Sequence, residues 1–382
     1  MNPTTYYTAD NDALETLSDD VGSLWCRPIK VFKQCPDATT FLRDHVCKNV
    51  PCIIQNAIDS EHSLSPGALG LSLDDIIERV GKDAMLTVNT TPDGHGDTVR
   101  DCIVIGDDDD NKANKTESLF VKPHEQQMTI TEFRRLLRMG DEIDNSVQKG
   151  EELEAFPIGK SVAEDSHNDV TRTRRRAPPV VYYSKQSDCL RNEMKALFST
   201  NMFPESFEFA EEAFGTGQPD ALNLWIGNER SVSSMHKDFY ENLFLVCSGQ
   251  KEFVLCPPAD HLFLHEREFR SSTFSPVGKQ MDEWIVTVDR DDNGNELTTK
   301  WIEPDVTKDS CCEKYPLLDK SHPVKVLVAE GEMIYIPSLW YHRVTQTSET
   351  VGVNYWYDMN FDTPKWCYYN FLQQLSLSHR GK

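Results

Sequence analysis

The sequence predicts a mainly β protein, a double-stranded β-helix (jelly-roll) with helices added at both ends, and three observations lead to this prediction. First, residues 222–227, 243–247 and 250–256 are β-rich runs separated by turn residues. Second, helical periodicity occurs near the start of the chain and close to its end. Third, a His-x-Asp pair suits an extended strand and needs a neighbouring strand to complete it. A chain of 382 residues can form one such domain.

The first 139 residues are predicted to form helices and the first strands, packed on the barrel. Residues 9–24 and 38–47 have amphipathic helical patterns, and the apolar run 51–54 begins strand structure. Residues 73–80 and 130–139 are also predicted helices, the second capped by Thr129 or Thr131. The acidic run 107–110 is interpreted as a solvated loop tip.

Residues 140–179 are predicted to be a mobile insertion. The segment has many charges and almost no sustained apolar pattern, so it offers too little apolar surface to offset the cost of ordering it. Its arginine cluster is interpreted either as a solvated patch or as a docking or nuclear-import element. The cluster consists of Arg172, Arg174, Arg175 and Arg176.

The main barrel is predicted over residues 180–362, and a C-terminal helix over 363–382. Ser248 and Gly249 separate two β-rich runs, which predicts a hairpin. A second hairpin is predicted between residues 284–288 and 296–301, within an insertion that includes 289–300. Asn293 and Gly294 lie at its centre, and Asn-Gly favours the positive φ of a tight turn.

His236, Asp238 and His342 are the candidate metal ligands. Residues i and i+2 of a strand project to the same side, so His236 and Asp238 can hold one ion while Lys237 faces away. His342 must arrive from another strand. Two imidazoles and one carboxylate form the facial set that leaves positions open on Fe(II). An isolated His-x-Asp pair usually binds no metal, but the surrounding strand pattern favours a metal site here.

Lys251 is the second candidate functional residue. It shares a strand face with Phe253 and Leu255, and an unpaired charge on an apolar face is strongly unfavourable. One interpretation is an edge-strand lysine that reaches water. The other is a lysine that binds a dicarboxylate beside the metal, and the triad favours this second interpretation.

Residues 223–258 resemble the core of the JmjC 2-oxoglutarate oxygenases, which have a cupin-type fold. Supporting stretches at 41–57, 182–186, 329–342 and 353–362 extend the resemblance from about residue 35 to the end. The metal motif and its lysine are common to the family. HKDFYEN and NYWYDMNFD are more similar to the small-domain branch that includes (3S)-lysyl hydroxylases.

The resemblance implies Fe(II), with 2-oxoglutarate and O2 as cosubstrates, and metal-binding and catalytic roles for the triad. It also implies that Tyr182 and Ser233 bind the far carboxylate of the cosubstrate together with Lys251. The family often has threonine at the position of Ser233. Tyr183 would serve instead of Tyr182 if the strand register were shifted by one residue.

Two asparagines match polar positions near the cosubstrate and metal in the family. These are Asn242 and Asn354, and strand alternation places Asn354 on the face opposite Val353 and Tyr355. The alternative for Asn354 is a buried amide that satisfies backbone groups of the barrel.

The branch resemblance implies (3S)-hydroxylation of a lysine in a protein. The family's known targets are developmentally regulated GTP-binding proteins, which are translation-factor-related GTPases. Asp358 and Asp362 follow the last predicted strand and would suit a lysine ammonium at the mouth of the site. They are equally suited to the loop that caps the C-terminal helix.

Three alternative functions remain open. They are a metal-dependent peptidase acting on methylated histone tails, a histone lysine demethylase, and a non-catalytic cupin-like binding domain. The sequence contains no H-E-x-x-H and no recognisable Ser-His or Cys-His signature, which disfavours the peptidase. It also lacks recognisable chromatin-reader modules, which disfavours the demethylase.

Composition favours an intracellular enzyme with a basic partner. The net charge of −23 repels nucleic acid and attracts a basic protein or peptide. No apolar run is long enough to span a membrane, and no leader pattern is present. Eleven cysteines without a C-x-x-C pair indicate reduced thiols. We expect a cytoplasmic protein, also nuclear in part, and leave a homodimer open.

Overall fold

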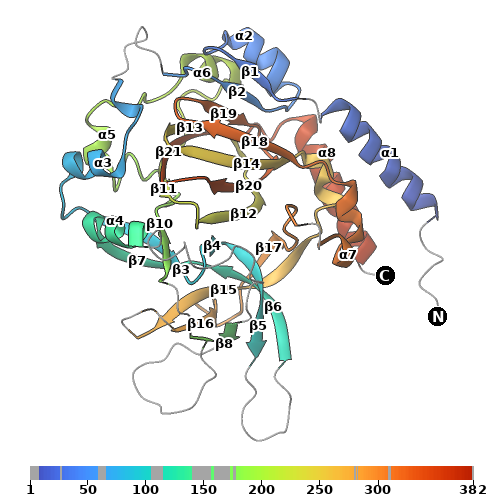
Figure 1. The fold of residues 1–382 in the computed structure, drawn as a ribbon. Helices are drawn as coiled ribbons and strands as arrows, with labels where there is room; N and C mark the ends of the chain where they lie inside the picture. The colour runs from blue at the N-terminus through green and yellow to red at the C-terminus, as the bar shows by residue number, and fades with distance from the viewer. Residues whose placement is uncertain are drawn as a thin grey trace, which may run out of the picture.

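The computed structural model describes residues 8–25, 28–58, 66–104, 115–139, 156–158, 173–174, 178–278, 281, 283–308 and 311–380. Two facing sheets form a barrel, helices surround it, and a third large sheet lies beneath it (Figure 1). The helices are α1 Thr8–Leu24, α2 Ala38–Phe41 with the π-helical turn Leu42–Val46, α3 Leu73–Val80, α4 Ile130–Met139, α5 Lys195–Phe198, α6 Glu208–Phe214, α7 Cys311–Lys314 and α8 Pro364–Arg380.

The barrel confirms the predicted jelly-roll. One sheet has the order β1-β2-β19-β13-β21-β11 and the other β18-β14-β20-β12-β4. The first sheet consists of β1 Lys30–Phe32, β2 Cys52–Ile54, β19 Met333–Ile336, β13 Tyr240–Ser248, β21 Thr350–Asp358 and β11 Ala221–Gly227. The second consists of β18 Val324–Ala329, β14 Gln250–Cys256, β20 Tyr341–Gln346, β12 Val232–Lys237 and β4 His95–Gly96.

Both faces of the first sheet are buried, and alternation divides its side chains between two cores. Leu243 and Tyr355 point outward into the main core, which also contains residues of the surrounding helices. Phe244 points inward and packs with Phe253 and Leu255 of the opposite sheet. The barrel interior is therefore apolar at this level, so any polar group deeper inside it needs a specific partner.

The third large sheet forms a platform below the barrel, with the order β17-β15-β6-β5-β8-β16-β9. It consists of β17 Thr298–Ile302, β15 Glu266–Val277, β6 Lys115–Lys122, β5 Thr98–Val104, β8 Phe156–Ile158, β16 Glu283–Val288 and β9 Thr173–Arg174. A separate three-stranded sheet contains β10 Val180–Tyr182, β3 Met85–Thr91 and β7 His124–Thr129. Residues 266–302 thus leave the barrel to build the platform.

The predicted hairpin at Ser248-Gly249 is wrong. β13 and β14 lie in opposite sheets, and β14 pairs with β18 and β20 instead. Gly249 has a φ of 76°, and a Cβ there would lie 2.5 Å from the carbonyl oxygen of Glu349. The turn therefore does exist, but it carries the chain from one sheet to the other.

The second predicted hairpin forms its turn but not its strand pair. Gly294 has a φ of 83°, and Arg290 and Glu296 form an isolated bridge. β16 and β17, however, each pair with a different half of β15. The twelve-residue β15 is long enough to template both strands, and the local turn signal could not show this.

Within the predicted insertion 140–179, the described residues form β8 and β9, which pair with strands of the platform. These pairings were not predicted, because the two segments are too short to show a period. Residues 140–155, 159–172 and 175–177 of the insertion lie outside the described residues, Arg172, Arg175 and Arg176 among them, and so does the acidic run 107–110.

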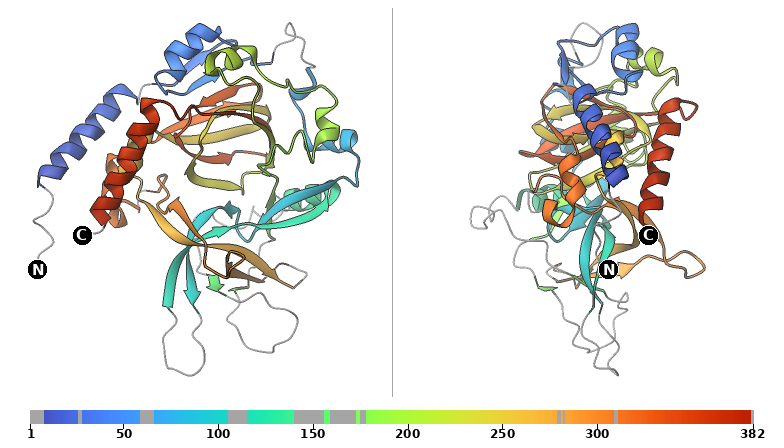
Figure 2. Two further views of the ribbon diagram at one scale, coloured as in Figure 1. Left: turned by 180° about the vertical axis from the view of Figure 1, so that it is seen from behind. Right: turned by 90° about the vertical axis from the view of Figure 1, so that its right-hand side faces the viewer.

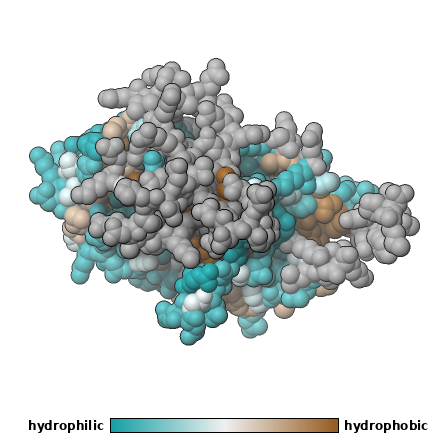
Figure 3. Space-filling model, turned by 90° about the horizontal axis from the view of Figure 1, so that it is seen from below, coloured by the Kyte–Doolittle hydropathy of each residue, from teal (hydrophilic) through white to brown (hydrophobic). Residues whose placement is uncertain are grey.

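The predicted terminal helices are present, and Figure 2 shows α1 and α8 lying alongside each other at one side of the barrel. Thr129 caps α4, since its Oγ1 accepts from the backbone N–H of Glu132 at 3.2 Å. None of the described helices is long and apolar enough to cross a membrane. Seen from below, the described part of the surface is mainly hydrophilic with small apolar patches (Figure 3).

Candidate metal centre

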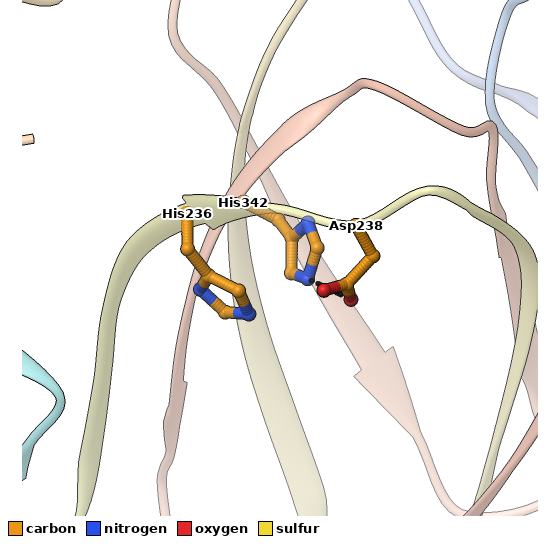
Figure 4. A group of neighbouring side chains, drawn as sticks. All are labelled: His236, Asp238 and His342. Atoms are coloured by element: carbon orange, nitrogen blue, oxygen red, sulfur yellow. Dashed lines mark ion pairs between the residues drawn. The ribbon is translucent and has the colours of Figure 1, made fainter. Parts of the chain in front are cut away.

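Two neighbouring strands bring the three candidate metal ligands together. His236 of β12 and His342 of β20 are register partners, with ring centroids 4.3 Å apart. Asp238 immediately follows β12, and its Oδ2 lies 3.5 Å from His342 Nε2. One donor atom from each residue lies within 4.8 Å of the other two, and the three side chains converge in Figure 4.

Backbone carbonyls fix the tautomer of both imidazoles. His236 Nδ1 lies 2.7 Å from the oxygen of Ser234, and His342 Nδ1 lies 3.1 Å from the oxygen of Trp340. Because a carbonyl oxygen only accepts hydrogen bonds, each Nδ1 must carry the proton. Each Nε2 is left with a lone pair, as a metal ligand requires.

Electrostatics hold His236 and Asp238 in the protonation states that bind metal. Burial, and after it the nearness of His342, lowers the pKa of His236 to about 4. Burial alone would raise the pKa of Asp238, but the adjacent imidazoles of His342 and His236 keep it below its ordinary value. Neutral imidazole and ionised carboxylate at neutral pH fit a divalent metal.

Lys237 lies on the other side of β12, as alternation predicts. Its ammonium forms a buried ion pair with Glu266 and lies 5.1 Å from the ring centroid of Tyr341. This pairing keeps the positive charge of Lys237 out of the space between the metal ligands.

Trp301 is a residue of the site that the sequence did not indicate. It belongs to β17 of the platform, and its indole stacks on the His236 ring at 5.8 Å with an interplanar angle of 4°. Its Nε1 donates to Ser234 Oγ at 2.8 Å. The contact depends on how the platform meets the barrel, and nothing in the local sequence of β17 specifies it.

Lys251 lies deeper in the barrel and is only 5% exposed. The same small cavity is lined by Tyr182 and Ser233, so the three predicted cosubstrate residues share one space. The Tyr182 hydroxyl lies so close to Gly96 that a Cβ there would overlap it. The alternative residue, Tyr183, also lines this cavity, but its hydroxyl is directed to Glu193 at 2.9 Å and its ring packs in the main core.

Asn242 and Asn354 are buried and in contact. Asn354 Nδ2 donates to Asn242 Oδ1 at 3.3 Å, and Asn354 Oδ1 accepts from Trp225 Nε1 at 2.8 Å. Asn354 is therefore bonded to side chains that face the barrel interior. Sequence alternation had placed it on this face.

Asp358 and Asp362 are both exposed, so they do not belong to the buried site. Asp358 ends β21 opposite Tyr240, which stacks on Trp356 at 4.8 Å and donates to Asp220 at 3.3 Å. Burial raises the pKa of Tyr240, and the carboxylates of Asp220 and Asp358 raise it further. Asp220 and Asp358 thus lie on either side of Tyr240, which follows Asp238 by two residues in the chain. We call these two carboxylates the acidic rim.

Comparison with known proteins agrees with this geometry. The family described as "Cupin-like domain" matches residues 38–363. JmjC domain-containing protein E of Dictyostelium discoideum is 31% identical, over 93% of each chain. The human bifunctional peptidase and (3S)-lysyl hydroxylase JMJD7 is 30% identical, over 92% of this chain and 91% of its own. Lysine-specific demethylase JMJ32 of Arabidopsis thaliana is 31% identical, over 90% and 85%.

These matches extend over nearly the whole chain. The barrel has the topology expected of this family, and the His-Asp-His set converges. The resemblance inferred from the sequence is confirmed. The chain belongs to the cupin-like JmjC family of oxygenases.

Proposed function

We propose that this chain is an Fe(II)- and 2-oxoglutarate-dependent protein hydroxylase that adds a hydroxyl group to C3 of a lysine in a protein substrate. The observation that carries the proposal is the placement of Lys251 inside the same barrel as the metal triad. A buried ammonium behind a facial metal set is suited to a dicarboxylate that chelates the metal with its other end.

The residues of the chain divide the work of such a reaction. His236, Asp238 and His342 would hold Fe(II), and Lys251, Tyr182 and Ser233 would bind the far carboxylate of 2-oxoglutarate. Bound Fe(II) with 2-oxoglutarate and O2 supplies an oxidant strong enough for an unactivated C–H bond. In the net reaction one oxygen atom of O2 enters the substrate C–H bond and the other enters succinate, with release of CO2.

The stacked Trp301 and the two backbone carbonyls limit rotation of the imidazoles. Because the metal ligands are fixed, the bond that is oxidised depends on where the protein holds the substrate. This positioning accounts for much of the selectivity of such enzymes. Asn242 and Asn354 are buried and bonded to each other, and by the family resemblance they would provide hydrogen-bonding groups near the cosubstrate.

The choice of lysine is supported by the acidic rim and by the human relative. Asp220 and Asp358 lie beside Tyr240, next to the triad, and the whole chain carries a charge of −23. The human relative is named a (3S)-lysyl hydroxylase. A basic protein, such as a developmentally regulated GTP-binding protein, is therefore the proposed substrate, and cytoplasm with nucleus the proposed location.

The demethylase alternative has one specific support, the name of the Arabidopsis relative, and the peptidase alternative is supported by the other half of the human relative's name. Both are distinguished from hydroxylation by their products. Hydroxylation retains the added oxygen atom, demethylation releases formaldehyde, and peptidase action cuts the chain.

The test is incubation of a lysine-containing GTPase peptide with the protein, Fe(II), 2-oxoglutarate and O2, followed by mass spectrometry and succinate assay. We expect succinate in step with a peptide heavier by about 16 Da, one oxygen atom. Fragments without succinate would support the peptidase, and formaldehyde from a methylated peptide would support the demethylase. A non-catalytic domain would give no product at all.

A further inference from the structure

Lys251 is buried with a neutral partner instead of a charged one. Its Nζ donates to Gln346 Oε1 at 2.9 Å, and among the described residues it forms no ion pair. Lys251 and Gln346 are register partners on β14 and β20. Burial lowers the pKa of Lys251 to about 7, which means that the pocket does not compensate the ammonium charge. The charge is left for a ligand to neutralise.

The amide of Gln346 is held in one orientation. Its Nε2 donates to both the carbonyl oxygen and the hydroxyl oxygen of Ser231, which leaves Oε1 facing Lys251. Ser231 Oγ donates in turn to the carbonyl oxygen of Asn228 at 2.9 Å. Gly227 provides the space, because a Cβ there would lie 2.5 Å from Ser231 Oγ and 2.6 Å from Gln346 Nε2.

We propose that Gln346 is the positioning and specificity residue of the cosubstrate pocket, holding the Lys251 ammonium for the far carboxylate of a 2-oxo dicarboxylic acid. An ammonium has three N–H donors, and the amide oxygen takes one. The other two remain for the ligand carboxylate. A carboxylate at position 346 would bind Lys251 equally well but would neutralise it and repel the ligand, so the amide is what selects a dicarboxylate. This inference rests on the proposed function.

The test compares Gln346→Glu and Gln346→Leu with the matched control Gln250→Glu. Gln250 is the neighbour of Lys251 on β14, and its side chain bonds to the exposed Thr347. Gln250→Glu therefore adds the same charge beside the same lysine but outside the barrel. Calorimetry on Mn(II)-loaded protein measures the dissociation constants of 2-oxoglutarate and of 2-oxopentanoate, which has a methyl group in place of the far carboxylate.

We expect Gln346→Glu to weaken 2-oxoglutarate binding roughly a hundredfold and to change 2-oxopentanoate binding less than about threefold. Gln346→Leu removes the acceptor without adding a charge, so the loss should be about tenfold. Mn(II) affinity should stay close to wild type in both variants, because Gln346 is not a metal ligand. Gln250→Glu should bind both ligands as the wild type does.

One outcome would overturn only the role of Gln346 and leave the proposed function standing. The wild type would prefer 2-oxoglutarate, but Gln346→Glu and Gln250→Glu would bind it with equal affinity. Equal losses for both ligands would also overturn it, because they would indicate a general structural effect. A wild-type protein that shows no preference for 2-oxoglutarate over 2-oxopentanoate would instead overturn the proposed function, and this inference with it.

Discussion

The floor and the rim of the barrel are built in opposite ways. On the floor, Lys251 and Gln346 are buried, and each has a hydrogen-bond partner at a defined distance. On the rim, Asp358 and Asp362 are exposed, and the aromatic side chains of Phe239 and Phe361 are 43% and 50% exposed. Burial gives floor contacts a large energetic effect, whereas water and salt weaken contacts on the rim.

This difference separates two parts of the proposed function, binding of the small cosubstrate on the floor and selection of the protein substrate at the rim. A floor whose groups have few alternative partners should bind only a narrow class of small molecule, and the buried Lys251 leads us to expect a dicarboxylate. We expect the rim to give weak, additive preferences for a basic protein surface, so that many contacts together select the substrate. Variants of the floor should accordingly have larger effects than variants of the rim.

The largest effect is expected at the metal ligands that separate floor from rim. His236→Ala or Asp238→Ala removes one of three protein donors, so turnover should fall below detection. Removal of a group that only hydrogen-bonds to a metal ligand usually costs less, roughly 10 to 100-fold in activity or metal affinity. Succinate formation measures this. Asp319→Ala, an exposed carboxylate on the 3-10 turn Pro316–Lys320, is the control and should retain activity. Full Fe(II)-dependent activity of Asp238→Ala would contradict the triad.

On the floor, Lys251→Ala should raise the 2-oxoglutarate requirement far more than the peptide requirement. Removal of one partner from a buried charge-assisted pair costs on the order of 3 to 5 kcal/mol, which corresponds to more than about a hundredfold in KM. Steady-state titration of each substrate separates the two effects. An unchanged KM for 2-oxoglutarate would show that Lys251 lies outside the cosubstrate pocket.

The floor should also give 2-oxoglutarate binding a specific pH dependence. Burial lowers the pKa of Lys251 to about 7 in the empty pocket, and a bound carboxylate would raise it. The affinity for 2-oxoglutarate is then highest below pH 7. Above pH 7 it falls, approaching about tenfold per pH unit, because binding must be accompanied by uptake of a proton. Calorimetry of Mn(II)-loaded protein in two buffers measures that uptake.

Lys251→Arg is the control for this pH effect. Its guanidinium remains charged across the range, so the slope above pH 7 should disappear. If wild type and Lys251→Arg gave the same slope, the titrating group would lie elsewhere.

The smallest effect is expected at the rim. Replacing the target lysine by norleucine keeps the carbon chain and removes the charge, and the exposure of Asp358 limits the loss to about 1 kcal/mol, roughly fivefold in kcat/KM. Added salt should reduce this preference. Asp358→Asn should reduce it as well. Equal turnover of both peptides at low salt would leave lysine selectivity without support from the rim.

Strand alternation explains how much of this arrangement the sequence could predict. It placed His236 and Asp238 on one side of a strand, Lys237 on the other, and Asn354 on the face opposite Val353 and Tyr355, which in the structure is the barrel interior. The helices α3 and α4 were also predictable, because an amphipathic period and its cap are local signals.

What the sequence could not predict depends on which strands become neighbours. The turn at Gly249 was recognisable, but the pairing of β14 with β18 and β20 was not. The contacts of Trp301 with His236 and of Gln346 with Ser231 join segments far apart in the chain. Such contacts arise from packing, and a short-range pattern carries no information about them.

We propose that the metal triad and Lys251 bind the two ends of one molecule of 2-oxoglutarate. The most direct test is calorimetric binding of 2-oxoglutarate and of glutarate, which lacks the keto oxygen, with and without Mn(II). We expect Mn(II) to tighten 2-oxoglutarate binding by up to about a hundredfold and to leave glutarate binding nearly unchanged, and we expect Lys251→Ala to lose binding of both ligands. The same 2-oxoglutarate affinity with and without Mn(II) would contradict it.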